Sequence, residues 1–265
     1  MDDTAVDAYL QRIGGVRPGR RDLDALRELQ IRHLLTVPFE NLGIHLDEQI
    51  SLDEPALLDK VVGRRRGGFC YELNGVFGGL LTALGFDVTL LAARVQGGDG
   101  FGPPFDHLAL RVLAADGEVP GPWLVDVGFG QFAHYPLRLD VAADQVEPGG
   151  TFRVIPAPDG DVDIVCGDWV EYRLEPHPRV LTDFEPTCWW HRTSPKSHFT
   201  NSLVCSRLTE RGRITLSGRT LIETDAGQRR KTELHGDEEV LDAYDRHFGV
   251  RLDRVPEVRT AGRMT

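Results

Sequence analysis

Cys70 is the residue of this 265-residue sequence that is best placed for nucleophilic chemistry. It follows Gly67 and Gly68, which permit a tight turn and a close approach of the backbone. A helix is predicted to begin at Cys70, and the unpaired N–H groups of a first helical turn favour negative charge. Such a position lowers the pKa of a thiol, and the same N–H groups could hold an oxyanion. The alternative is a small buried apolar residue, the usual role of a free cysteine.

A thiolate nucleophile needs a base, and the base needs a carboxylate that orients it. His107 begins the apolar segment 107–112, and Asp126 lies inside the apolar segment 123–130, where an unpaired acid is costly to bury. Adjacent strands would place the imidazole beside the carboxylate, with the helix of Cys70 packed across them. The order Cys, His, Asp therefore predicts a catalytic triad. An ordinary core or surface histidine and an exposed edge-strand acid are the alternatives.

Other residue patterns have less specific interpretations. The glycine-rich segment 98–102 is followed by prolines rather than by a helix, so it is not a dinucleotide-binding fingerprint. Cys188 and His191 have the spacing of metal ligands but no second pair, so residues 188–190 are predicted to form a buried aromatic strand and no metal site is expected. The basic run 64–66 is interpreted as a solvated helix end, with attraction of an anionic ligand as the alternative.

The composition argues against several classes of protein. The 30 Lys and Arg residues against 41 Asp and Glu residues give a formal net charge of −11, which disfavours nucleic acid and anionic lipid as partners. The four cysteines are widely spread, unlike those of a disulfide scaffold. No apolar run reaches the roughly 18 residues of a membrane span, and the chain starts with acidic residues rather than with a secretory signal. A cytoplasmic location is therefore expected, with no membrane partner.

The hydrophobic spacing predicts an α+β protein whose segments change type along the chain. Helices are expected in the first third over residues 4–13, 22–35, 53–62 and 70–84. An antiparallel sheet or small barrel is expected in the middle third from strands over residues 86–95, 107–113, 123–127, 151–155 and 162–174. The proline-rich segment 176–186 is interpreted as a connection. The last third is expected to contain strands over residues 202–208, 213–217, 220–223 and 229–234 and a helix over 237–248.

Several of these segments together resemble the arylamine N-acetyltransferase family. Residues 66–74 (RGGFCYELN) resemble the cysteine motif of that family almost letter for letter. Residues 37–42 (VPFENL) resemble its N-terminal signature, 126–130 (DVGFG) its aspartate motif, and 194–199 (SPKSHF) a segment near the start of its third domain. The matches are in order and extend over about positions 1 to 250, which makes the resemblance more specific than one short pattern.

The resemblance implies a three-part α+β fold around a core like that of the cysteine proteases. It places a helical bundle that carries Cys70 at residues 1–85. A β-barrel that carries His107 and Asp126 is expected at residues 86–186, and an α/β lid at 187–265.

The resemblance also implies ping-pong acyl transfer. Cys70 would attack the thioester of acetyl-CoA and become acetylated, His107 would accept the thiol proton, and Asp126 would hold the imidazole ring. An arylamine, hydrazine or arylhydroxylamine would then accept the acetyl group. The expected partners are thus a small-molecule acceptor and an acyl-CoA donor, with no metal; a homodimer is a further possibility.

Pocket residues also follow from the resemblance. Four side chains match positions along the acceptor and acyl site: Phe39, Val95, Phe129 and Phe199. Core packing is their alternative role. Gly128 and Gly130 flank Phe129 and are expected to permit a close approach of coenzyme A, which would enter between barrel and lid.

Asp106 stands where some members of the family carry a small hydroxyl residue. It is interpreted as a surface acid; pointing inward, it would alter the preference for the acyl donor or repel an anionic one.

Other functions remain open for the same residues. Some relatives of this fold are amide synthases, which close a macrolactam from a carrier-bound polyketide chain with the same triad. A cysteine hydrolase with the same order of residues is a second alternative. A non-enzymatic binding module is a third, although intact Cys70, His107 and Asp126 argue against it.

Overall fold

Helices form most of the N-terminal part of the protein in a computed structural model, which describes residues 1–258. The side chain of Asp2 accepts a hydrogen bond from the N–H of Ala5, and Asp22 accepts one from Ala25, so each aspartate caps a helix. These helices are α1 (Asp3–Ile13), α2 (Leu23–Thr36), α3 (Leu42–His45), α4 (Glu54–Leu58) and α5 (Cys70–Ala83). The helix predicted over 53–62 is present, but after α4 it continues as a π-helical turn, Asp59–Gly63.

A long antiparallel sheet curls into a barrel in the middle of the chain. Its strands are β2 (Asp87–Gly97), β3 (Gly100–Phe101), β4 (His107–Leu113), β5 (Trp123–Val125), β6 (Leu137–Arg138), β7 (Gln145–Glu147), β8 (Gly150–Pro156), β9 (Val162–Cys166) and β10 (Trp169–Arg179). Neighbours follow the order β6-β5-β4-β2-β10-β9-β8-β7, and β3 pairs with β2. Because β4 lies between β2 and β5, the start of β4 and the end of β5 meet at one end of the barrel.

Two predictions for the barrel are wrong in detail. The single strand expected over 162–174 is a hairpin, β9 and β10, which turns at Gly167 with a φ of 59°. The connection expected from Pro176 is still strand, because β10 continues to Arg179. Its register with β2 shifts between Leu174 and Pro178, as expected where proline cannot donate to the ladder.

A second sheet forms the C-terminal part of the fold. It contains β11 (Val204–Thr209), β12 (Gly212–Ser217), β13 (Thr220–Asp225) and β14 (Gln228–Glu233), followed by α8 (Asp237–Phe248), which packs on β11 and β12. Its edge strand is β1 (Phe39–Glu40), which lies far away in the sequence, in the segment expected to be a helical bundle. Phe39 pairs with Ser206 and Glu40 with Cys205, so this sheet joins the first and last thirds of the chain.

The segment after the barrel is helical, contrary to the aromatic strand predicted over 188–190. It forms a 3₁₀ turn (Leu181–Phe184), α6 (Glu185–Thr193) and α7 (His198–Asn201). Pro186 lies in the first turn of α6, where its missing N–H is tolerated. Helical spacing then buries Cys188 and His191 and leaves the Trp189 side chain 64% exposed.

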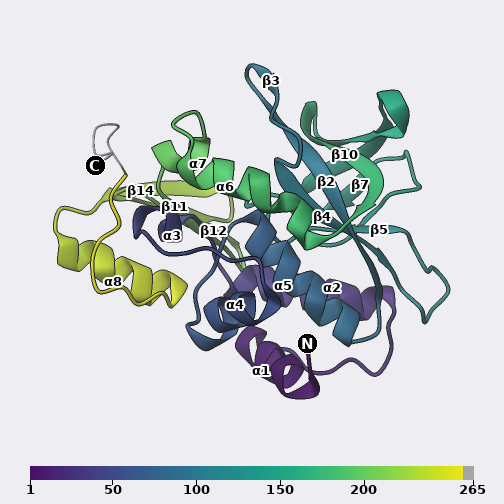
Figure 1. Cartoon of the computed structure of the whole chain (residues 1–265), viewed down its shortest axis with the longest axis horizontal. Coiled ribbons are helices and arrows are strands. Elements are labelled where there is room, and N and C mark those ends of the chain that lie inside the picture. Colours follow the sequence, from purple (N-terminus) through teal and green to yellow (C-terminus); the bar gives the residue numbers. More distant parts are fainter. Residues whose placement is uncertain (259–265) are drawn as a thin grey trace.

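The three groups of elements meet around α5. In Figure 1 the barrel lies at the right, the second sheet with α8 at the left, α5 in the centre between them and α1 at the bottom. One apolar core packs α1, α2 and α5 against β4 and β5, and a smaller one surrounds Cys70 with side chains from α5, β4 and the turn before α6. The predicted α+β class and three-part architecture are confirmed. Within residues 1–258, we find no helix with the length and apolar character needed to cross a membrane.

Candidate active site

Cys70 is the first residue of α5, and it follows a loop in which two positions leave no room for a side chain. A Cβ atom on Gly67 would lie 1.8 Å from the carbonyl oxygen of Pro38, and one on Gly68 would lie 2.7 Å from the Cβ of Glu72. The N–H of Glu40 donates to the carbonyl of Gly68 at 2.8 Å. The two glycines therefore let the loop pack against β1, which places Cys70 in the junction between the two sheets.

The structure brings His107 and Asp126 together, as the alternation of strands predicts. His107 begins β4 and Asp126 directly follows β5. The Nε2 atom of His107 lies 2.7 Å from Oδ2 of Asp126, and both side chains are buried. Because the carboxylate accepts the proton on Nε2, the neutral imidazole has Nδ1 as its free base.

Asp126 accepts three further hydrogen bonds. Its Oδ2 accepts one from the hydroxyl of Tyr172 at 3.2 Å, and its Oδ1 accepts one from Nδ2 of Asn74 at 2.8 Å and one from the N–H of Gly128 at 2.9 Å. All of these donors are neutral groups. They satisfy the buried carboxylate without cancelling its charge.

Asn74 aligns the helix of Cys70 with the two strands. It lies one turn after Cys70, on the same face of α5. Besides Asp126, its amide donates to the carbonyl of Leu108 at 2.6 Å and accepts from the N–H of Val127 at 2.9 Å. Sequence reasoning assigned no role to Asn74, although a buried amide four residues after the cysteine is a signal. Tyr172, which lies 46 residues beyond Asp126, gave no such signal.

Cys70 itself is almost completely enclosed. Burial raises the pKa of its thiol well above the ordinary value, and the hydrogen bond from the backbone of Leu108 lowers it by less. This direction is opposite to the one predicted from the start of the helix, because desolvation of the thiolate outweighs the helix dipole. Burial also raises the pKa of Cys188 and Cys205. The pKa of the thiol therefore does not distinguish Cys70 from the other buried cysteines. Because burial disfavours a lone thiolate, a thiolate at Cys70 requires a nearby base that carries the proton.

The four aromatic and aliphatic side chains expected to contact substrate are all half-buried. The ring of Phe129 packs edge-on against His107 with a centroid distance of 5.1 Å. The ring of Phe199 lies 5.5 Å from Phe69, the neighbour of Cys70, and 6.2 Å from Phe39. Val95 pairs with Tyr172 across β2 and β10.

The two glycines beside Phe129 differ from each other. A Cβ atom on Gly128 would lie 2.8 Å from the Cα of Cys70, so Gly128 permits the close packing of this loop on α5. Gly130 has a φ of 95° and open space where a side chain would stand. The space that a ligand could use is therefore beside Gly130.

Asp106 is not the surface acid that was predicted. Its side chain is only 11% exposed, and its Oδ1 lies 3.1 Å from Nε2 of His191. Its Oδ2 accepts a hydrogen bond from the N–H of Val95 at 3.2 Å. A Cβ atom on Gly102 would lie 2.1 Å from Oδ2 of Asp106, so this glycine makes room for the inward carboxylate.

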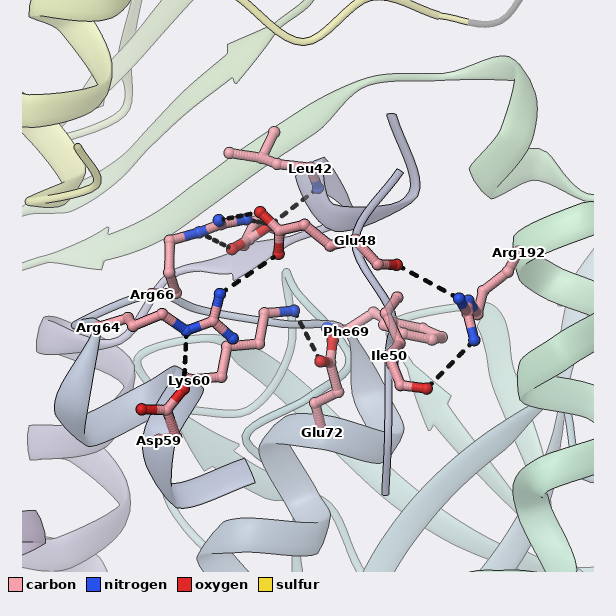
Figure 2. Close-up of polar contacts among 11 residues, drawn as sticks. Leu42, Glu48, Ile50, Asp59, Lys60, Arg64, Arg66, Phe69, Glu72 and Arg192 are labelled. Carbon is pink, nitrogen blue, oxygen red and sulfur yellow. Dashed lines mark hydrogen bonds and ion pairs between the residues drawn. The ribbon is translucent and has the colours of Figure 1, made fainter. Parts of the chain in front are cut away.

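The basic run 64–66 matches its prediction as a solvated helix end at Arg64 and Arg65, which are exposed, but not at Arg66. Arg64 pairs with Asp59 at 3.0 Å. Arg66 is buried and pairs with Glu48 at 2.7 Å, as Figure 2 shows. It also pairs with Glu40 at 2.8 Å. The fixed partners of Arg66 explain its burial.

Arg66 belongs to a buried ion-pair cluster that consists of Glu40, Glu48, Lys60, Arg66 and Glu72. Nζ of Lys60 lies 2.6 Å from Oε1 of Glu72, whose Oε2 accepts the N–H of Phe69 at 3.2 Å (Figure 2). Burial opposes ionisation of Glu40, but Arg66 and Lys60 outweigh it and lower the pKa of Glu40 to about 2. The cluster thus fixes the loop before Cys70 from the side of β1.

Metal ligation is not indicated by the side chains of residues 1–258, which contain no group of three or more His, Cys, Asp or Glu residues that could hold an ion. His191, which has metal-like spacing from Cys188, faces Asp106 instead.

Comparison with known proteins gives one consistent family. A family model described as N-acetyltransferase matches residues 22–257. The arylamine N-acetyltransferase of Mycolicibacterium smegmatis is 36% identical over 256 residues, which cover 92% of this chain and 91% of that protein. The corresponding protein of Escherichia coli is 34% identical over 79% of this chain and 75% of its own length.

Solved structures show the same similarity in three dimensions. The Mycobacterium marinum arylamine N-acetyltransferase in complex with CoA has a TM-score of 0.84 and 33% identity, with 92% of each chain covered. The Salmonella typhimurium enzyme has a TM-score of 0.86 and 29% identity, covering 98% of this chain and 96% of its own. The similarity therefore covers nearly all of the fold, including the residues that surround Cys70.

Proposed function

This chain belongs to the arylamine N-acetyltransferase family, and on that premise we propose that it carries acetyl from acetyl-CoA to an arylamine, arylhydrazine or arylhydroxylamine through a thioester on Cys70. Members of the family are acyltransferases whose donor is acetyl-CoA. The observation that carries the assignment of residues is the buried 2.7 Å contact between His107 and Asp126, with Cys70 on the helix that Asn74 ties to the same carboxylate.

In the first half-reaction Cys70 is acylated. The thiol proton passes to Nδ1 of His107 as the sulfur attacks the thioester carbonyl, and Asp126 stabilises the imidazolium ion through Nε2. The tetrahedral adduct then breaks its bond to the sulfur of coenzyme A, which takes the proton from His107. The raised pKa of the buried thiol favours this concerted transfer, because a thiolate without an imidazolium partner would be poorly solvated.

In the second half-reaction the acceptor is acylated. The amine nitrogen attacks the carbonyl of acetyl-Cys70, its proton passes to His107, and the bond to the cysteine sulfur breaks. That proton then returns to the sulfur. The enclosed position of Cys70 keeps water from competing with the amine for the thioester. An aromatic amine suits this step because it remains neutral and nucleophilic at pH 7.

The acceptor and acyl pocket is formed by Phe39, Val95, Phe129 and Phe199 in this proposal. Phe129 packs against His107, and Phe39 and Phe199 pack against the apolar cluster that contains Cys70, as a flat aromatic ligand requires. Val95 is included on the family resemblance and on its place opposite Tyr172. Gly128 and Gly130 are proposed to contact coenzyme A. The support is stronger for Gly130, which has open space beside it.

Coenzyme A enters between the barrel and the second sheet. A hollow of about 520 Å³ lies there, and its walls include Gln131 and Phe132 from the loop after Gly130. Arg213 and Arg229 lie on the facing wall and supply positive charge for phosphate groups.

Further parts of the assignment are proposals of the same kind. We divide the chain into a bundle at 1–85, a barrel at 86–186 and a lid from 187, of which residues 259–265 lie outside the described part. The sequence of element types supports these boundaries, with β1 as an addition to the lid sheet. A cytoplasmic location and a homodimer remain predictions from the sequence and its resemblance.

Intact-protein mass spectrometry after addition of acetyl-CoA without an acceptor tests the proposal. We expect one acetyl group, mapped to Cys70 and released by an arylamine. The matched control is Cys166→Ser on β9, which should be acetylated like the unaltered protein. An acetyl group on a different residue, or none, would refute the mechanism. Absence of acetylation would favour a carrier-bound donor and hence the amide-synthase alternative.

A further inference from the structure

Asp106 and His191 form a buried pair that the proposed mechanism does not use. Asp106 directly precedes His107, whereas His191 lies on α6, 85 positions further along the chain. Their side chains are 11% and 6% exposed, and Oδ1 lies 3.1 Å from Nε2. Their geometry does not meet that of a hydrogen bond, so among residues 1–258 the buried Nε2 of His191 has no hydrogen-bond partner and faces only this carboxylate. Burial of a carboxylate and a histidine costs desolvation free energy, so a role for the pair is expected.

The pair connects two segments that carry proposed pocket residues. On one side Oδ2 of Asp106 accepts the N–H of Val95 at 3.2 Å. On the other side Nδ1 of His191 lies 3.2 Å from Oγ of Ser197, which accepts the N–H of Phe199 at 3.2 Å and so caps α7. A continuous polar chain therefore runs from Val95 on β2 to Phe199 on α7.

Ring contacts hold His191 at the same place. Its ring lies 5.0 Å from that of Phe199, edge-on, and 6.0 Å from that of Tyr71, the residue after Cys70. The hydroxyl of Tyr71 donates to the carbonyl oxygen of Asp106 at 3.1 Å. The pair is thus packed beside the cysteine but contacts the pocket walls rather than the thiol.

We infer that Asp106 and His191 are a positioning pair for the acceptor: they fix the distance between the Val95 and Phe199 walls of the pocket and thereby set its fit to an aromatic amine. This inference rests on the proposed function. The pair acts through Val95 and Phe199, so its removal should loosen acceptor binding much more than it slows acylation of Cys70 by acetyl-CoA.

Two variants remove the pair in different ways. Asp106→Asn keeps an oxygen for the N–H of Val95 and removes only the charge that faces His191. His191→Ala also removes the contact with Ser197. The control is Asp163→Asn, which breaks a barrel ion pair with Arg173 at 2.8 Å that contacts none of these residues. We expect the KM for an arylamine such as 4-aminosalicylate to rise about tenfold in either pair variant, with kcat and the rate of Cys70 acetylation within about threefold.

The double variant tests whether the two residues act as one unit. Its KM should equal that of His191→Ala, because the second change has no contact left to break. Equal losses in both half-reactions, or an unchanged KM in both single variants, would overturn the inference. So would failure of both single variants to fold while Asp163→Asn folds, since the pair would then be purely structural.

Failure of the proposed function gives a different result. If acetyl-CoA does not acetylate Cys70 in the unaltered protein, the proposed function is wrong. Binding of 4-aminosalicylate to the unacetylated protein, followed by ligand-observed NMR, then tests the pair directly. Weaker binding in Asp106→Asn and His191→Ala than in Asp163→Asn would still support the pair, and equal binding in all three would refute it.

Discussion

Two buried polar clusters flank the loop that ends at Cys70, and they hold their carboxylates in opposite ways. In the ion-pair cluster, Glu40 faces the cation Arg66, and Glu72 faces the cation Lys60 (Figure 2). In the cluster around Asp126, the partners are an imidazole, an amide, a phenol and a backbone N–H. Among residues 1–258, no lysine or arginine pairs with Asp126.

The two clusters differ in whether the negative charge of the carboxylate is neutralised by a cation. The charge of Glu40 is cancelled by Arg66, so Glu40 serves to hold the loop in place. The charge of Asp126 is only solvated by dipoles, so it can still act on its neighbours. Burial together with the Asp126 charge raises the pKa of Tyr172 well above its ordinary value. The same charge is available to stabilise a proton on His107. One cluster should therefore control stability and the other the rate of acyl transfer.

Removal of the nucleophile should have the largest effect. We expect Cys70→Ala to abolish acetyl transfer, because the proposed thioester forms on the sulfur of Cys70. The protein should stay folded, since the change removes only one buried sulfur. Steady-state turnover with acetyl-CoA and an arylamine, together with a thermal melt, measures both. Cys166→Ala is the control and should keep full activity; turnover in the Cys70 variant would contradict covalent catalysis.

Replacement of the uncancelled charge should have the next largest effect. Asp126→Asn should lower kcat/KM about 10³-fold or more, because the amide cannot stabilise an imidazolium and favours the wrong tautomer of His107. The rate of Cys70 acetylation by acetyl-CoA, measured by quenched-flow mass spectrometry, reports this loss.

The matched control removes one neutral donor and leaves the charge in place. Tyr172→Phe loses only the 3.2 Å bond to Asp126 and should lower the same rate about tenfold or less. If the two variants were equally slow, the hydrogen bonds rather than the charge of Asp126 would explain its role.

Loss of a cation from the ion-pair cluster should instead reduce stability. Lys60→Met leaves Glu72 buried without its 2.6 Å partner, which should lower the free energy of unfolding by about 3–5 kcal/mol. Urea unfolding measures it, and the exposed pair of Arg17 with Asp7 provides the control. Arg17→Met also loses the pair with Asp3, but both pairs are exposed and screened by water, so this variant should unfold at nearly the same urea concentration as the unaltered protein. A small loss of stability with a large loss of kcat in Lys60→Met would reverse the division between the clusters.

The sequence was sufficient to predict features that depend on neighbours in the chain. The spacing of apolar residues predicts α5 and the strands of the barrel, and strand order then brings His107 to Asp126. The prediction of an aromatic strand at 188–190 is wrong. A run of three apolar residues is too short to distinguish the periodicity of a strand from that of a helix, and Pro186 in the first turn of α6 is compatible with a helix.

Features that depend on distant contacts could not be predicted. The two-residue strand β1 exists only through its pairing with β11. The inward direction of Asp106 depends on Val95 and on the space above Gly102. The burial of Arg66 likewise requires Glu40, 26 positions earlier in the chain. The raised pKa of the Cys70 thiol follows from enclosure by residues of α5, β4 and α6, which no local motif records.

The last effect that we expect is the contribution of Glu40 to stability, which appears only at low pH. Its pKa is lowered from the ordinary 4.5 to about 2, so the folded state keeps Glu40 ionised where the unfolded chain binds a proton. The stabilisation is complete above about pH 5 and is lost as the pH falls toward 2, a change on the order of 3 kcal/mol. Urea unfolding at steps from pH 6 to pH 2.5 measures it.

The comparison with Glu40→Gln isolates this residue from the other carboxylates. The variant has no charge to lose, so although it is less stable at pH 6, its free energy of unfolding should fall less steeply toward pH 2.5 than that of the unaltered protein. Glu210→Gln, on an exposed turn, should give a curve parallel to that of the unaltered protein. If the Glu40→Gln curve were also parallel, Arg66 would not be cancelling the charge of Glu40. The contrast with the uncancelled charge of Asp126 would then lose its physical basis.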